Sequence, residues 1–62
     1  MVPAPIRTVL ADDHELVRSG LRNELGEGFE VVGEAGDAEG AIDVITARTP
    51  DLVVCDLHMP RG

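Results

Sequence analysis

The chain has 62 residues, with one cysteine, no lysine, and five arginines against twelve acidic residues, a formal charge of −7 at pH 7. A chain this short forms at most one domain, a single cysteine excludes an internal disulfide, and no cysteine pair is spaced for zinc. The excess of acidic residues and the scattered arginines oppose direct nucleic-acid binding by this segment. The sequence has no apolar run long enough to cross a membrane, and its first residues lack the pattern of a signal peptide. We therefore expect a cytoplasmic segment without membrane contact.

The first predicted strand covers residues 6–11, which are mostly apolar and partly β-branched, as in a strand buried on both faces of a parallel sheet. A helix is predicted over residues 15–25, because its apolar residues recur at four-residue spacing with one further leucine beside them. These residues are Val17, Leu21 and Leu25, with Leu16. Gly26 favours a left-handed end to the helix. The charged residues off the apolar stripe are expected to point away from the core: Arg18, Arg22 and Glu24.

A second strand is predicted over residues 29–35, where Glu30 and Glu34 bring the charge that is typical of a sheet edge. Asp37 then supplies an N-cap to a second helix, which Thr49-Pro50 ends. Its expected core-facing residues follow i, i+3, i+4, i+7 spacing: Ala38, Ala41, Ile42 and Ile45. The third strand, residues 52–55, is apolar at every position and leads directly into Asp56.

This βαβαβ order predicts an α/β fold. Helical crossovers between short strands imply parallel pairing with right-handed connections. The charged second strand suits an edge and the first strand suits the centre, so the expected spatial order is 2-1-3. The third strand is then an exposed apolar edge, which invites pairing with another chain. We therefore expect a homodimer or strand-exchanged oligomer that buries Val53 and Val54.

Three carboxylates are expected at the carboxyl edge of this sheet, because Asp12 and Asp13 follow the first strand and Asp56 follows the third. Open α/β sheets bind ligands there, where the winding reverses. Close carboxylates repel one another unless a cation compensates, and Mg²⁺ fits better than Zn²⁺ because it binds carboxylates together with waters and phosphoryl oxygens. One carboxylate is then left to form an acyl phosphate, and Asp56 is the best-placed nucleophile.

A simpler interpretation is that Asp12 and Asp13 cap the first helix and that Asp56 opens a loop. For any single aspartate this simpler role is favoured. A double acid after the first strand, combined with a lone acid and Met59-Pro60 after the third, favours the functional interpretation instead.

The stretches 9–14 (VLADDH), 16–21 (LVRSGL) and 50–60 (PDLVVCDLHMP) together resemble a bacterial response-regulator receiver domain over nearly the whole chain. The resemblance implies a flavodoxin-like doubly wound parallel sheet, truncated to βαβαβ. It implies that Asp56 is the phosphoacceptor for a histidine kinase, and that Mg²⁺ is bound by Asp13, Asp56 and the backbone carbonyl of His58, with Asp12 acting through water. The stretch 16–21 especially resembles regulators that end in a LuxR-type helix-turn-helix domain, through which the whole protein would contact DNA and control transcription.

Receiver domains also use a Ser or Thr after strand four and a Lys after strand five, and residues 1–62 reach neither. These groups neutralise charge on the transferred phosphoryl group. We therefore interpret the chain as the first half of a receiver, with three strands and two helices. By itself it is expected to bind metal weakly and to accept phosphate poorly.

Two other functional classes remain as alternatives. Phosphatases of the haloacid-dehalogenase type also form an aspartyl phosphate, but they place a second acid two residues after the nucleophile, where this chain has His58. The sequence thus favours a signalling module over an enzyme. The other alternative is an inert half-domain held together by self-association.

Three further features have simpler explanations. A transition-metal site would need both His14 and His58 to turn inward, and His14 opens a helix. Cys55 lies in an apolar strand and is expected to be a small buried hydrophobe. The glycines that follow the second strand's apolar core do not match a dinucleotide-binding spacing, and we interpret them as turn, cap and packing residues: Gly33, Gly36 and Gly40.

Overall fold

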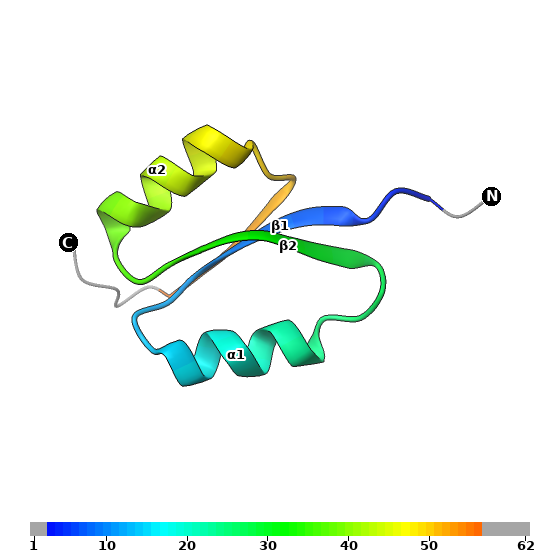
Figure 1. Ribbon diagram of the computed structural model, residues 1–62, viewed down its shortest axis with the longest axis horizontal. Helices are drawn as coiled ribbons and strands as arrows, with labels where there is room; N and C mark the ends of the chain where they lie inside the picture. Colours follow the sequence, from blue (N-terminus) through cyan, green and yellow to red (C-terminus); the bar gives the residue numbers. More distant parts are fainter. Residues whose placement is uncertain (1–2, 57–62) are drawn as a thin grey trace.

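Figure 1 shows the computed structural model of the chain, which describes residues 3–56. The elements are β1 (Ile6–Ala11), α1 (Glu15–Glu24), β2 (Phe29–Ala35), α2 (Ala38–Arg48) and β3 (Leu52–Cys55). The strands form one parallel sheet in the order β2-β1-β3, with α1 and α2 on opposite faces (Figure 1). The predicted α/β class and strand order are therefore confirmed. The predictions for His58, Met59 and Pro60 lie outside the described residues.

The core centres on β1, which pairs with both neighbouring strands. Its last four residues are buried, and they provide the largest fully buried side chains of the described chain: Leu10, Val9 and Thr8. Ala11 contacts two further buried alanines, Ala35 of β2 and Ala41 of α2. Because these side chains are small, α2 approaches the sheet closely. Gly33 completes this contact, since a Cβ there would clash with Cγ1 of Val44 in α2.

The second helix begins and ends as predicted. Oδ1 of the N-cap residue Asp37 accepts a hydrogen bond from the Gly40 N–H at 2.6 Å, and the C-cap Thr49 takes a left-handed φ of 44°. The core-facing prediction was wrong for Ile42, which is 64% exposed. The helix meets the sheet along the narrow stripe of Ala41 and Val44, and Ile42 lies about 100° around the axis from Ala41.

The end of α1 differs from the prediction. Leu25 is the C-cap in an extended conformation, and its N–H donates to the Leu21 carbonyl. Gly26 does not take a left-handed conformation, so no glycine cap is formed. No residue of α1 is fully buried. The helix therefore rests on the sheet rather than within a closed core.

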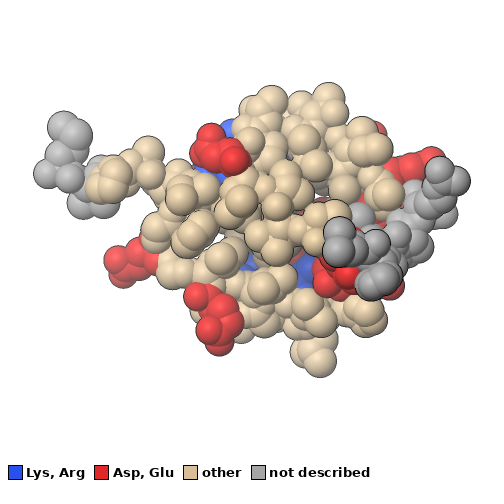
Figure 2. All heavy atoms as spheres, turned by 180° about the vertical axis from the view of Figure 1, so that it is seen from behind, with Lys and Arg blue, Asp and Glu red and all other residues tan. Residues whose placement is uncertain are grey.

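The third strand forms an open edge. It pairs only with β1 among the described strands, and both Leu52 and Val53 remain exposed. Figure 2 looks at the molecule from this side, where most of the visible surface is uncharged. The predicted exposed apolar edge is confirmed. The prediction of a buried Cys55 was wrong, because Cys55 is exposed at the end of this edge strand of the described sheet.

Hydrogen bonds join Arg7 of β1 to Asp51, the residue just before β3. The Arg7 N–H donates to Oδ2 of Asp51 at 3.0 Å, and the Asp51 N–H donates to the Arg7 carbonyl at 2.8 Å. These bonds hold the entry to β3 in register with β1. Neither described helix has the length and apolar character needed to span a membrane.

Candidate functional site

Three of the predicted site residues meet at the carboxyl edge of the sheet. The Asp12 N–H donates to the Ala35 carbonyl at 3.0 Å, and the Asp56 N–H donates to the Ala11 carbonyl at 2.9 Å. The strand hydrogen bonding thus continues past β1 and β3 and fixes both backbones. Ligand atoms of Asp12, Asp13 and Asp56, together with one from His14, all lie within 4.8 Å of one another. We call these four residues the acidic group. His58, the fourth predicted ligand, lies outside the described residues.

His14 is the member of the acidic group that sequence reasoning placed only at the helix start. Its backbone N–H donates to Oδ1 of Asp12 at 2.8 Å. Its ring Nδ1 lies 3.1 Å from the same oxygen and 2.7 Å from Oδ1 of Asp13. His14 is itself the N-cap residue of α1 and makes no side-chain cap, so Asp12 binds the cap residue rather than the first helical turn. The adjacency of His14 to two acids was the signal that pointed to this contact.

The charges of the acidic group shift one another's protonation. The hydrogen bond from the His14 N–H lowers the pKa of Asp12, with the imidazole and the Arg18 charge acting in the same direction and burial opposing them. The hydrogen bond to Asp12 raises the pKa of His14, as do the charges of Asp13 and Asp56. The carboxylates therefore favour the protonated form of His14, which would act as a counter-cation for them.

A second charged contact lies beside the acidic group. Glu34 of β2 binds Nη1 of Arg22 through one carboxylate oxygen, and its other oxygen lies 3.8 Å from Nη1 of Arg18. The prediction that the arginines point away from the core was wrong for Arg18, whose side chain is only 19% exposed, whereas Arg22 is exposed at 44% as expected. The apolar spacing of α1 did not indicate this, since the partner is a charge on the neighbouring strand.

The donor set of the acidic group fits a hard divalent cation. Carboxylate oxygens are ligands that Mg²⁺ prefers, and at Mg–O distances of about 2.1 Å two opposite ligands lie about 4.2 Å apart. The ligand oxygens of Asp12, Asp13 and Asp56 lie within 4.8 Å of one another, so only small side-chain movements would bring them around one ion. The ring nitrogen of His14 would move away from these oxygens when a cation takes its place. The transition-metal alternative would also need His58.

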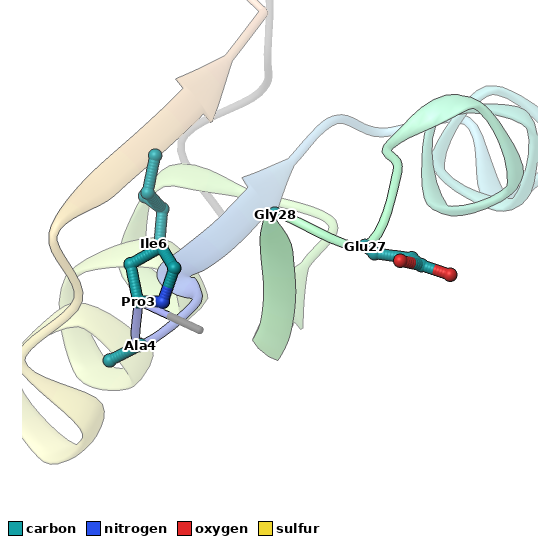
Figure 3. A pocket seen from close by; sticks show the side chains of 5 residues that line it. All are labelled: Pro3, Ala4, Ile6, Glu27 and Gly28. Atoms are coloured by element: carbon teal, nitrogen blue, oxygen red, sulfur yellow. The ribbon is translucent and has the colours of Figure 1, made fainter. Parts of the chain in front are cut away.

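A shallow hollow of about 480 Å³ lies at the opposite end of the sheet (Figure 3). Its lining is mostly apolar and comes from the start of β1 and the turn before β2: Pro3, Ala4, Ile6, Glu27 and Gly28. Because Ile6 begins β1 whereas Asp12 follows its end, this hollow is separate from the acidic group.

Comparison with known proteins gives one consistent family. The profile of the response regulator receiver domain matches residues 8–62. The transcriptional regulatory protein PdtaR of Mycobacterium tuberculosis is 45% identical over 58 residues, covering 92% of this chain and 28% of that protein. The protein-glutamate methylesterase/protein-glutamine glutaminase 4 of Anaeromyxobacter dehalogenans is 43% identical over 61 residues, which cover 95% of this chain and 17% of that protein.

A solved structure gives the same result. The two-component response regulator of the LuxR family from Aurantimonas sp. SI85-9A1 superposes with a TM-score of 0.83 at 43% identity. The alignment covers 95% of this chain and 45% of that one. The chain therefore spans about a quarter of PdtaR and less than half of the solved regulator.

Proposed function

Because this chain belongs to the response regulator receiver domain family, we propose that Asp56 is its phosphoacceptor and that Asp12, Asp13 and Asp56 hold Mg²⁺. The observation that supports this most directly is the convergence of three carboxylates from the ends of β1 and β3. Family membership alone does not position these residues. The backbone hydrogen bonds at Asp12 and Asp56 provide that positioning.

The proposed reaction transfers a phosphoryl group from a histidine kinase to Asp56. A carboxylate oxygen of Asp56 attacks phosphorus, a P–O bond forms as the P–N bond to the kinase histidine breaks, and the released imidazole nitrogen keeps the electron pair and takes up a proton. Bound Mg²⁺ would neutralise charge on the phosphoryl oxygens. Asp13 would bind the ion directly and Asp12 through water, with the carbonyl of His58 as a further ligand.

The remaining proposals concern the whole protein. We infer a cytoplasmic signalling regulator rather than an enzyme, with residues 1–62 as the first half of its receiver domain. The later strands would supply the Ser or Thr and the Lys, and a LuxR-type domain would bind DNA. One relative carries an esterase name, so an enzymatic output is the alternative for the rest of the protein. The sequence and mass of the full-length protein would show whether a DNA-binding domain or an enzymatic domain follows the receiver.

Magnesium binding is expected to lower the pKa of His14. Without the ion, the carboxylates of Asp12 and Asp13 favour the protonated imidazole and raise this pKa. Mg²⁺ at those carboxylates removes that attraction and repels the imidazolium, so its pKa falls towards the ordinary histidine range. NMR titration of the His14 ring, with and without saturating MgCl₂, measures the change.

Asp13→Asn is the control for this titration. The substitution removes one of the two carboxylates that contact Nδ1, so the pKa of His14 should fall even without magnesium. The further shift on adding MgCl₂ should then be small. An unchanged His14 pKa in the wild-type protein at saturating MgCl₂ would contradict magnesium binding at the acidic group.

We also propose that the 62-residue chain pairs with a second copy through β3. Its edge presents the exposed apolar residues Leu52 and Val53, and no other described strand pairs with it on that side. Sedimentation velocity is expected to show concentration-dependent dimers, and Val53→Lys should shift the chain to monomer because a lysine charge opposes edge pairing. Leu16→Lys, on the exposed side of α1, should leave dimers intact. A folded wild-type monomer at micromolar concentration contradicts the proposal.

A further inference from the structure

Three charged side chains that are largely withdrawn from solvent lie near α1 and the carboxyl ends of β1 and β2. Their exposed fractions are 14% for Asp12, 19% for Arg18 and 21% for Glu34. Glu34 and Asp12 lie at the same end of the sheet, because the Asp12 N–H binds the carbonyl of Ala35. Arg18 lies one helical turn after His14, whose own N–H binds Asp12. The fold thus places the Arg18 guanidinium beside Glu34 and close enough to Asp12 for its charge to lower the pKa of that carboxyl.

The contacts that Arg18 makes are too weak to compensate for the cost of burying its charge. Its Nη1 lies 3.8 Å from Oε1 of Glu34, which is too long for a hydrogen bond, and the other Glu34 oxygen is bound to Arg22. Its Nε is buried without a hydrogen-bond partner in the described part of the chain. A buried charged donor without a partner destabilises a fold. The position of the charge, rather than the strength of its contacts, is therefore the feature to explain.

We propose that Arg18 is a positioning residue of the acidic group: anchored by Glu34, it keeps a fixed positive charge beside Asp12 and weakens the binding of a divalent cation there. This inference rests on the proposed function, because it takes Asp12 as part of the magnesium site. The guanidinium relieves repulsion among the carboxylates when the ion is away and opposes its approach. The ion then exchanges with solution instead of being held permanently.

The test is magnesium binding to the full-length protein, measured by calorimetry with MgCl₂ at neutral pH and low salt. Arg18→Gln is expected to lower the Kd for Mg²⁺ by about three- to tenfold, because it removes a nearby repulsive charge. Arg18→Lys keeps the charge and should bind as the wild type does. Arg22→Gln removes a charge one turn farther along the same helix and should change the Kd by less than about twofold.

Salt dependence separates this electrostatic role from a structural one. At about 1 M NaCl the Debye length is about 3 Å, but partly buried charges are screened less than exposed ones, so the difference between wild type and Arg18→Gln should become smaller without disappearing. A structural role for Arg18 would leave a difference that does not depend on salt. Equal or weaker magnesium binding by folded Arg18→Gln at low salt overturns the proposal.

Glu34→Gln tests the same inference and should change magnesium affinity in the opposite direction. It replaces Arg18→Gln as the test if that variant does not fold. It keeps Arg18 and removes its carboxylate neighbour, so magnesium binding should weaken by about two- to fivefold. Unchanged or tighter binding overturns the inference. If the wild type binds magnesium and these variants do not differ from it, only the inference fails. A wild-type protein that binds no magnesium overturns the proposed function as well.

Discussion

Asp56→Asn is expected to abolish phosphoryl uptake by the full-length protein. The substitution keeps the shape of the side chain and the backbone bond from the Asp56 N–H to Ala11, but the amide is a poor nucleophile. Loss of a covalent nucleophile costs roughly 10³-fold or more in rate. The measurement is incorporation of ³²P from a phosphorylated histidine kinase or a small acyl phosphate in the presence of MgCl₂.

Asp43→Asn is the matched control. Asp43 is an exposed aspartate on α2, away from the acidic group, so its amide variant should incorporate phosphate as the wild type does. Label retained at a similar level in Asp56→Asn would show that another residue accepts the phosphoryl group. Labelled protein should also lose its phosphate in mild base, as an acyl phosphate does.

The 62-residue chain itself should incorporate little label under the same conditions. Its acidic group supplies negative charge and metal ligands, whereas the described residues place no lysine there to neutralise the phosphoryl oxygens. Incorporation equal to that of the full-length protein would contradict the proposal that residues 1–62 hold only half of the site.

Gly33→Ala is expected to destabilise the fold by about 1–3 kcal/mol. The new Cβ would clash with Cγ1 of Val44, and a β-branched side chain in a helix has little freedom to rotate away. The helix α2 would therefore have to move off the sheet at the contact formed by Ala11, Ala35 and Ala41. Urea unfolding, followed by circular dichroism, measures the loss.

Gly20→Ala is the matched control, with the opposite sign. Gly20 lies within α1, and a Cβ there has no atom within 4 Å. Alanine removes the entropic penalty of glycine in a helix and should stabilise the chain by about 0.5–1 kcal/mol. If Gly33→Ala proved as stable as the wild type, the close approach of α2 to β2 would be wrong.

The secondary structure and topology were predictable because local patterns carried them. All three strands begin and end at the predicted residues, and Asp37 caps α2 as expected. The acidic group followed from topology: in a parallel sheet with β1 beside β3, residues that follow the two strands must lie at the same edge. Asp12 and Asp56 therefore come together although they lie 44 positions apart in the sequence.

The failures share another cause, which is that periodicity shows which residues share a face but not what covers it. Ile42 has the spacing of a core residue and Cys55 lies in an apolar strand, yet both are exposed because the described chain places no element over them. Arg18 departs in the opposite direction. Its charged side chain is largely buried, because its guanidinium turns towards Glu34 of β2, the carboxylate that also binds Arg22.

The sequence by itself determined the βαβαβ order, the central position of β1 and the meeting of Asp12, Asp13 and Asp56 at one edge. Those outcomes depend on apolar spacing and strand direction, which local chemistry decides. Only the tertiary structure decided that His14 joins the carboxylates and that Arg18 lies beside them in a poorly hydrated corner. These placements depend on which way each side chain turns once the backbone is folded, and their energies depend on distances and burial that no linear pattern records.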